Sequence, residues 1–148
     1  MTNQEKKELF FEIISVEINW DMDYQNLVLG CKAKLKVRVG SKIKLSFATS
    51  RDGQINAFDI AIRQILRDFY PEIDEVSIID FSVHLVEGTE RKGTAGYVKV
   101  KIKISFDGKT KDFEGMGSDM VATAIDTIAT AYNYAISEII NGKKSVLV

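Results

Sequence analysis

The chain has 148 residues, of which 45% are hydrophobic and 28% are charged, with a single proline. This composition excludes disordered and fibrous proteins and predicts a single globular domain over residues 1–148. The formal net charge is −1, so the chain has no overall electrostatic attraction to nucleic acid or to anionic membranes, and we expect neither as a partner.

Cysteine and histidine each occur once, as Cys31 and His84. One cysteine excludes a disulfide within the chain, and these two residues are too few for the usual zinc ligand sets, so we expect no metal and no cofactor. No serine or cysteine motif of a catalytic site accompanies His84, and we expect no enzymatic activity. Because no apolar run reaches the ~18 residues of a membrane-spanning helix and the start lacks a secretory signal, we expect a cytoplasmic protein.

Three strands are predicted at the start of the chain. Residues 9–20 are rich in phenylalanine and isoleucine, and turn-forming residues follow at 21–26. Residues 27–39 end in strict alternation of apolar and basic side chains, which indicates a strand with one face in solvent. After the short connection Gly40-Ser41, apolar and polar residues alternate again over 42–47, so the second and third strands are expected to form a hairpin.

A helix is predicted next, because the spacing of the apolar residues changes from two to 3.6. The apolar stripe starts after Gly53, and either Ser50 or Asp52 is positioned to cap the first turn. Pro71 ends the predicted helix, since proline cannot continue it.

The second half repeats this order. The predicted strands are 76–88, 98–106 and a shorter one at 109–113. Asp107-Gly108 is a hairpin signal between the last two strands. A long amphipathic helix follows and is predicted to end at Asn141-Gly142.

The two halves, approximately residues 9–70 and 76–141, therefore share the predicted order βββα. Each half is too small to bury both a sheet face and a helix alone, so the two are expected to pack together with pseudo-twofold symmetry. We predict an α+β fold in which the helices pack on antiparallel strands.

Three glycine-containing segments are candidates for function: residues 51–57, 87–96 and 114–120. Two of them directly precede the predicted helices. Glycine permits positive φ angles and close approach of a ligand, and the free N–H groups at a helix start favour a carboxylate or phosphate. The alternative is that these segments are ordinary strand-to-helix turns.

Rows of basic side chains are a second candidate. They comprise Lys32, Lys34, Lys36, Arg38, Lys42 and Lys44 in the first half and Lys99, Lys101 and Lys103 in the second. Such rows could bind RNA or an acidic partner. However, they contain almost no aromatic residues for base stacking, and lysines on exposed strand faces also prevent edge-to-edge aggregation. A solvated face is therefore the favoured interpretation, with nucleic-acid binding kept as an alternative.

In their order, these elements and glycine segments resemble the C-terminal regulatory domain of 2-isopropylmalate synthase and of its relative citramalate synthase. Residues 53–62, GQINAFDIAI, are similar to the family's opening of the first helix. Residues 93–102, GTAGYVKVKI, and 115–121, GMGSDMV, are similar to its glycine-threonine loop and to the start of its second helix. Gln54 and Asn56 depart from the Pro and Asp usual in the family.

The resemblance implies a homodimer that binds an end-product branched-chain amino acid, leucine or isoleucine, and mediates feedback inhibition. It also implies that the chemistry belongs to a separate barrel, so this chain is either part of a synthase or a partner of a catalytic synthase subunit. We expect the ligand carboxylate at helix-start N–H groups and its ammonium near Asp119. The residues expected to bind it are Gly53, Gln54, Ile55, Asn56, Ala57, Thr94, Ala95, Gly117, Ser118, Asp119, Met120 and Val121. The alternative is a structural dimerisation module that binds no ligand.

Overall fold

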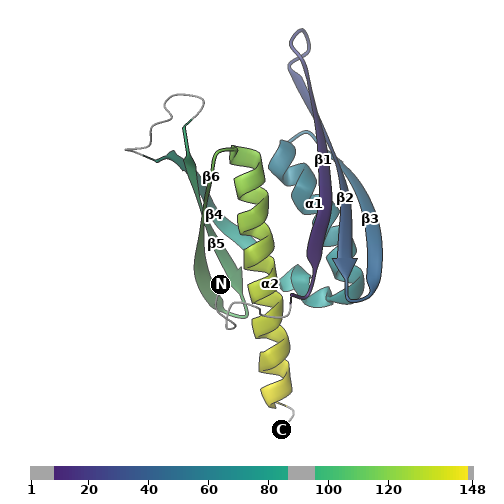
Figure 1. Ribbon diagram of the computed structural model, residues 1–148, viewed down its shortest axis with the longest axis vertical. Coiled ribbons are helices and arrows are strands. Elements are labelled where there is room, and N and C mark those ends of the chain that lie inside the picture. The colour runs from purple at the N-terminus through teal and green to yellow at the C-terminus, as the bar shows by residue number, and fades with distance from the viewer. Residues whose placement is uncertain (1–8, 87–95, 147–148) are drawn as a thin grey trace.

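The structure is a computed structural model and describes residues 9–86 and 96–146. Its elements, in chain order, are β1 (Glu12–Asp23), β2 (Val28–Val39), β3 (Lys42–Ser50), α1 (Gln54–Phe69), the 3-10 helix η2 (Pro71–Glu75), β4 (Ser77–Leu85), β5 (Val98–Phe106), β6 (Lys109–Gly117) and α2 (Met120–Val146). The order βββα therefore occurs twice (Figure 1).

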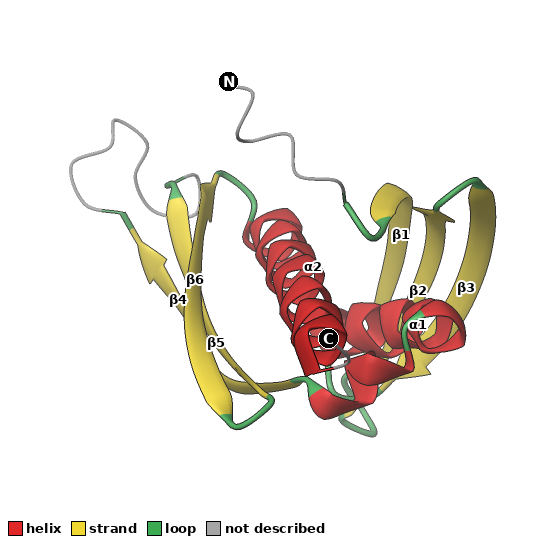
Figure 2. Cartoon of the chain, turned by 90° about the horizontal axis from the view of Figure 1, so that it is seen from below, coloured by secondary structure: helices red, strands yellow, loops and turns green. Residues whose placement is uncertain are grey.

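The strands form two separate antiparallel sheets, β1-β2-β3 and β4-β5-β6. Helix α1 packs on β2 and β3, and α2 packs on β5 and β6, so each helix covers the sheet of its own half. Figure 2 shows both helices lying between the two sheets. This arrangement confirms the predicted α+β fold of two βββα units with helices on antiparallel strands.

The alternating patterns explain why the helices lie where they do. On β2, Leu35 and Val37 are buried beneath α1, whose own Phe58 is fully buried. On β5, Ile102 takes the same role beneath α2. Side chains of both halves join one hydrophobic cluster, and burying each large apolar side chain contributes roughly 1.5–3 kcal/mol to folding. The two units thus share a core.

Several element boundaries differ from the sequence prediction, and three of them have a clear physical reason. β1 continues to Asp23 through residues predicted as a turn, because they keep pairing with β2. β6 extends beyond residue 113 to Gly117, so the glycine segment is partly strand. α2 continues through Gly142 to Val146, since one glycine costs a long helix only about 1 kcal/mol relative to alanine.

Within residues 9–86 and 96–146, no helix is both long enough and apolar enough to cross a membrane.

Candidate functional site

The predicted ligand-binding residues that the structure describes lie at the starts of the two helices. Figure 1 shows α1 and α2 beginning at the same end of the molecule, the upper end in that view. The two glycine-containing segments that precede the helices are therefore at one end of the fold.

The start of α1 has no side-chain cap. Gly53 is the N-cap residue, with a φ of 116° that only glycine adopts readily, and no side chain accepts a hydrogen bond from the first turn. The predicted capping by Ser50 or Asp52 is wrong. The Ser50 hydroxyl is used instead to accept the N–H of Asp52 at 2.9 Å and to donate to Oδ1 of Asn56 at 2.7 Å. The first-turn N–H groups consequently remain available to an anion.

The predicted residues of α1 fall into two groups. Gln54, Ile55 and Asn56 are half-buried at the helix start. Ala57 is fully buried in the core, and its N–H donates to the carbonyl of Gly53 at 3.1 Å. Ala57 therefore belongs to the packing of α1 on its sheet.

The start of α2 differs because Asp119 caps it. Oδ1 of Asp119 accepts the N–H of Ala122 at 2.8 Å, and its carbonyl accepts the N–H of Thr123 at 3.0 Å. Ser118, Asp119 and Met120 are exposed, and the half-buried Val121 packs against the core. The two helix starts thus offer different chemistry, open N–H groups on α1 and a carboxylate on α2.

The glycines before α2 serve close packing. Neither Gly115 nor Gly117 has a positive φ, but a Cβ on either would lie less than 3.0 Å from a threonine hydroxyl of α2. The threonines are Thr127 opposite Gly115 and Thr123 opposite Gly117, and both are buried. These glycines let α2 approach β6, which is a sufficient reason for their presence.

Two predicted residues, Thr94 and Ala95, lie outside the described residues.

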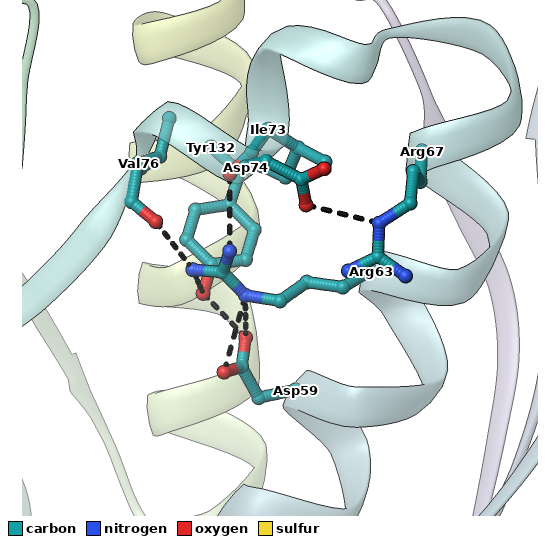
Figure 3. Close-up of polar contacts among 7 residues, drawn as sticks. All are labelled: Asp59, Arg63, Arg67, Ile73, Asp74, Val76 and Tyr132. Carbon is teal, nitrogen blue, oxygen red and sulfur yellow. Dashed lines mark hydrogen bonds and ion pairs between the residues drawn. The ribbon is translucent and has the colours of Figure 1, made fainter.

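A polar cluster links the two halves at the middle of the helices (Figure 3). Arg63 of α1 donates to Asp59 at 3.1 Å, to the carbonyls of Ile73 and Val76 at 3.0 and 2.8 Å, and to the hydroxyl of Tyr132 at 2.9 Å. The Tyr132 hydroxyl in turn donates to the Asp59 carboxylate. One guanidinium therefore joins α1, η2 and α2.

The surroundings of this cluster set its charges. Tyr132 is fully buried, and burial raises the pKa of its phenol, with the neighbouring Asp59 carboxylate adding to the shift. Burial alone would lower the pKa of Arg63, but Tyr132 and Asp59 raise it overall. The cluster is a fixed ion pair with a neutral phenol. Each nitrogen of the Arg63 guanidinium and the Tyr132 hydroxyl donates within the cluster, so we interpret its role as holding the halves together.

A groove of about 1020 Å³ lies between the beginning of β1 and α2. Asn133 of α2 lines this groove and binds the backbone that precedes β1. Its Oδ1 accepts the N–H of Phe10 at 2.9 Å, and its Nδ2 donates to the carbonyl of Phe11 at 3.3 Å. Arg38 at its edge pairs with Glu12 at 3.2 Å. The groove contains none of the predicted ligand residues.

Sequence reasoning did not find the polar cluster or the role of Asn133. From the sequence alone, the run Tyr132-Asn133-Tyr134 on a long helix indicates packing, or an oligomer interface for the tyrosines. Tyr132 is fully buried, so it is not at a surface. Asp59 and Arg63 are spaced as an i,i+4 pair, which is a local signal, but Tyr132 is 69 residues away from Arg63 and no local pattern reports that contact.

The cysteine and the histidine of the chain lie apart from the groups described above. Cys31 is buried in the core, and His84 is exposed on β4 with its Nε2 3.2 Å from the Ser82 hydroxyl. Across the described ranges, no group of three or more His, Cys, Asp and Glu side chains could hold a metal ion.

The comparison with protein families agrees with this architecture. Residues 2–136 match the family described as the LeuA allosteric (dimerisation) domain, and the match takes in both βββα units except the end of α2. The chain belongs to this family.

Similar curated proteins are (R)-citramalate synthases. The enzyme of Geobacter sulfurreducens is 27% identical over 137 residues, which cover 91% of this chain and 25% of the relative. That of Sulfolobus acidocaldarius is 24% identical over 140 residues, covering 90% and 25%. A shorter match to the Aquifex aeolicus enzyme is 41% identical over 64 residues, covering 43% of this chain and 12% of the relative. Where the match spans most of this chain, it covers about a quarter of the relative's length.

Proposed function

We propose that this chain is the regulatory domain of a citramalate synthase or 2-isopropylmalate synthase-like enzyme, which forms a homodimer and binds a branched-chain amino acid, leucine or isoleucine, for feedback inhibition. Family membership supports the class of domain. The observation that carries ligand binding is the uncapped first turn of α1 behind Gly53.

In this proposal the ligand carboxylate accepts hydrogen bonds from the N–H groups of Gln54, Ile55 and Asn56. A helix start supplies both free donors and the positive end of the helix dipole. The Asp119 carboxylate at the start of α2 receives the ligand ammonium through Oδ2, while Oδ1 keeps the helix cap. Backbone recognition of this kind requires no catalytic side chains.

Regulation follows if the ligand binds one arrangement of the domain and the catalytic part more tightly than another. A coupling free energy of ~1–3 kcal/mol is typical for such control. The synthase activity itself would reside in the three quarters of the relatives' length that this chain does not match.

The alternative function is a dimerisation module without a ligand. It is favoured by the two structural duties described at the start of α2, where Asp119 caps the helix and Gly117 admits Thr123.

Calorimetric titration of the purified chain with leucine, isoleucine, valine and citramalate separates these functions, together with light scattering to count the protomers. Gln54→Glu is the sharpest variant. A carboxylate in the first turn stabilises the helix through its dipole but repels a ligand carboxylate. We expect affinity to fall at least fivefold while thermal stability is kept or increased. Gln64→Glu, an exposed position on the same helix, is the matched control and should leave affinity unchanged.

Selective binding of one amino acid that Gln54→Glu weakens would support the proposed regulatory function. A stable dimer that binds no amino acid would favour the structural module. Binding that Gln54→Glu leaves intact would place the ligand elsewhere on the domain.

A further inference from the structure

The two sheets turn very different faces to solvent. In both, the middle strand points lysines away from the helices. On the second sheet, Glu114 and Asp112 of β6 lie opposite Lys101 and Lys103, with N–O distances of 3.7 and 3.9 Å. That face is charge-balanced within itself.

On the first sheet, the outward side chains of the third strand, β3, are apolar, whereas outward side chains of the third strand of the second sheet, β6, are acidic. Ile43, Leu45 and Phe47 of β3 share the outer face with the lysines of β2 and are 49%, 67% and 59% exposed. Phe47 and Leu45 lie opposite Lys34 and Lys36, Ile43 lies opposite Arg38, and Lys32 is the next outward lysine along β2. Glu17 of β1 lies opposite Lys34, but none of the three lysines has an ion pair with any described residue. We call these three lysines and the three apolar residues of β3 the basic-apolar face. Exposed apolar patches of this kind mark interaction surfaces.

Acidic side chains, which are opposite in charge to the basic-apolar face, lie at the end of the same sheet. The hairpin between β1 and β2 projects beyond the starts of both helices (Figure 1). Its tip, residues 21–28, carries Tyr24 and Leu27, which are 78% and 80% exposed, together with the carboxylates of Asp21 and Asp23. The tip is therefore apolar and acidic.

The tip is held in one shape. Asp23 Oδ1 accepts the N–H groups of Gln25 and Asn26 at 3.0 and 3.2 Å, and Oδ2 accepts the Asn26 side chain at 2.7 Å. Leu27 has a φ of 54°, a conformation that costs a leucine energy. An ordered turn that presents two large side chains to solvent needs little further ordering on binding.

We propose that the hairpin tip of one copy docks on the basic-apolar face of a second copy, with Tyr24 and Leu27 against Leu45 and its neighbours. Carboxylates of the tip then meet the lysines of β2. Each copy has one tip and one face, so a twofold axis makes two identical contacts. The proposal rests on the proposed function only in that two copies associate, and it does not depend on ligand binding.

The apolar half of the contact is tested with Leu27→Asn and Leu45→Thr. Asparagine suits the positive φ at residue 27, and threonine keeps the strand preference at residue 45, so both variants should fold. Sedimentation velocity across a concentration series should show the dimer dissociation constant rising roughly tenfold or more for each. Met116→Thr, on β6 and 60% exposed, is the matched control and should associate like wild type.

The charged half is tested by charge reversal. Asp21→Lys places an ammonium on the tip and takes the formal charge of the tip from −2 to 0, because Asp23 remains. Lys32→Glu with Lys36→Glu makes the face acidic. Residues 32 and 36 face neutral Asn19 and Ser15 on β1, so the reversal creates no like-charge pair across that ladder. Each variant alone should dimerise more weakly than wild type. Asp21→Lys sets an ammonium against the lysines of β2, and Lys32→Glu/Lys36→Glu sets new carboxylates against those of the tip. An equimolar mixture should dimerise more tightly than either variant alone, since both contacts then pair opposite charges.

Loss in the single variants with recovery in the mixture supports the contact. A dimer unaffected by all of these changes overturns it, as does a wild-type chain that remains monomeric at every concentration. Binding of a labelled oligouridine that Lys32→Glu/Lys36→Glu abolishes, with the oligomeric state unchanged, would make RNA the occupant and also overturn it. Amino-acid titration of the same variants reports separately on the proposed regulatory function.

Discussion

Replacing Gly117 by alanine tests whether the glycines before α2 serve packing. The new Cβ would lie less than 3.0 Å from Oγ1 of Thr123, a distance that real Cβ atoms essentially never show. Thr123 has little freedom to move away, because its hydroxyl donates to the carbonyl of Asp119 at 2.6 Å and its side chain is buried. Either α2 shifts from β6 or the threonine loses its hydrogen bond.

The magnitude follows from these two choices. Overpacking a well-packed interior costs about 1–3 kcal/mol, and a lost hydrogen bond costs about 1 kcal/mol. We expect Gly117→Ala to lower the free energy of unfolding by about 2 kcal/mol. For a domain of this size that corresponds to a fall in melting temperature of roughly 4–8 °C.

A second substitution makes the reasoning specific. Thr123→Ala removes the clashing oxygen, and the next atom of residue 123, its Cβ, lies 3.6 Å from the new methyl group, an ordinary contact. The double variant should therefore be no less stable than Thr123→Ala alone, giving a favourable coupling of about 2 kcal/mol in a double-mutant cycle. Gly142→Ala is the matched control. Its Cβ meets nothing within 4 Å, and alanine should stabilise the helix by about 0.5–1 kcal/mol.

Thermal unfolding followed by circular dichroism measures all four variants. A Gly117→Ala chain as stable as wild type would refute the packing argument. So would a double variant in which the two losses simply add.

Three further predictions follow from buried side chains. Tyr132→Phe removes hydrogen bonds to Asp59 and from Arg63, and urea unfolding should show a loss of about 1.5–3 kcal/mol; an unchanged midpoint would mean that the cluster does not join the halves. Because the pKa of Tyr132 is raised above its ordinary value of 10.0, the stability linked to it is complete below pH 10 and is lost as pH rises further. Alkaline unfolding should therefore begin later in Tyr132→Phe than in wild type, when each is measured relative to its own stability at neutral pH. Burial raises the pKa of the Cys31 thiol, so a thiol reagent should label it only as fast as the chain unfolds, and fast labelling of the folded chain would contradict its place in the core.

The fold was predictable because its information is local. Alternation along β2 and β5 and the 3.6-residue spacing on α1 and α2 are each visible within a few turns of chain. Pro71 and Asp107-Gly108 mark breaks that the structure keeps. The prediction for residues 115–117 was wrong because glycines are typical of loops. Here glycine is required because threonines of the following helix pack directly against this strand.

The candidate site was less predictable because its geometry depends on competition between groups. Ser50 and Asp119 are both residues that cap helices, yet only Asp119 does so here. The hydroxyl of Ser50 is drawn instead to Asn56, a partner that the sequence does not single out. The alternation over 42–47 was visible in the sequence, but only the register with β2 shows that its apolar side chains share the solvent face with lysines.

The cluster around Arg63 also sets how the two helices can move. Both helices begin at the same end of the molecule, but the cluster fastens them at unequal distances from it. Tyr132 lies about 18 Å along α2 from its first residue, whereas Asp59 and Arg63 lie about 8 and 14 Å along α1. A tilt of one helix against the other that keeps these hydrogen bonds would pivot at this point. The start of α2 is farther from the cluster than the start of α1, so the same rotation would displace Asp119 more than Gly53.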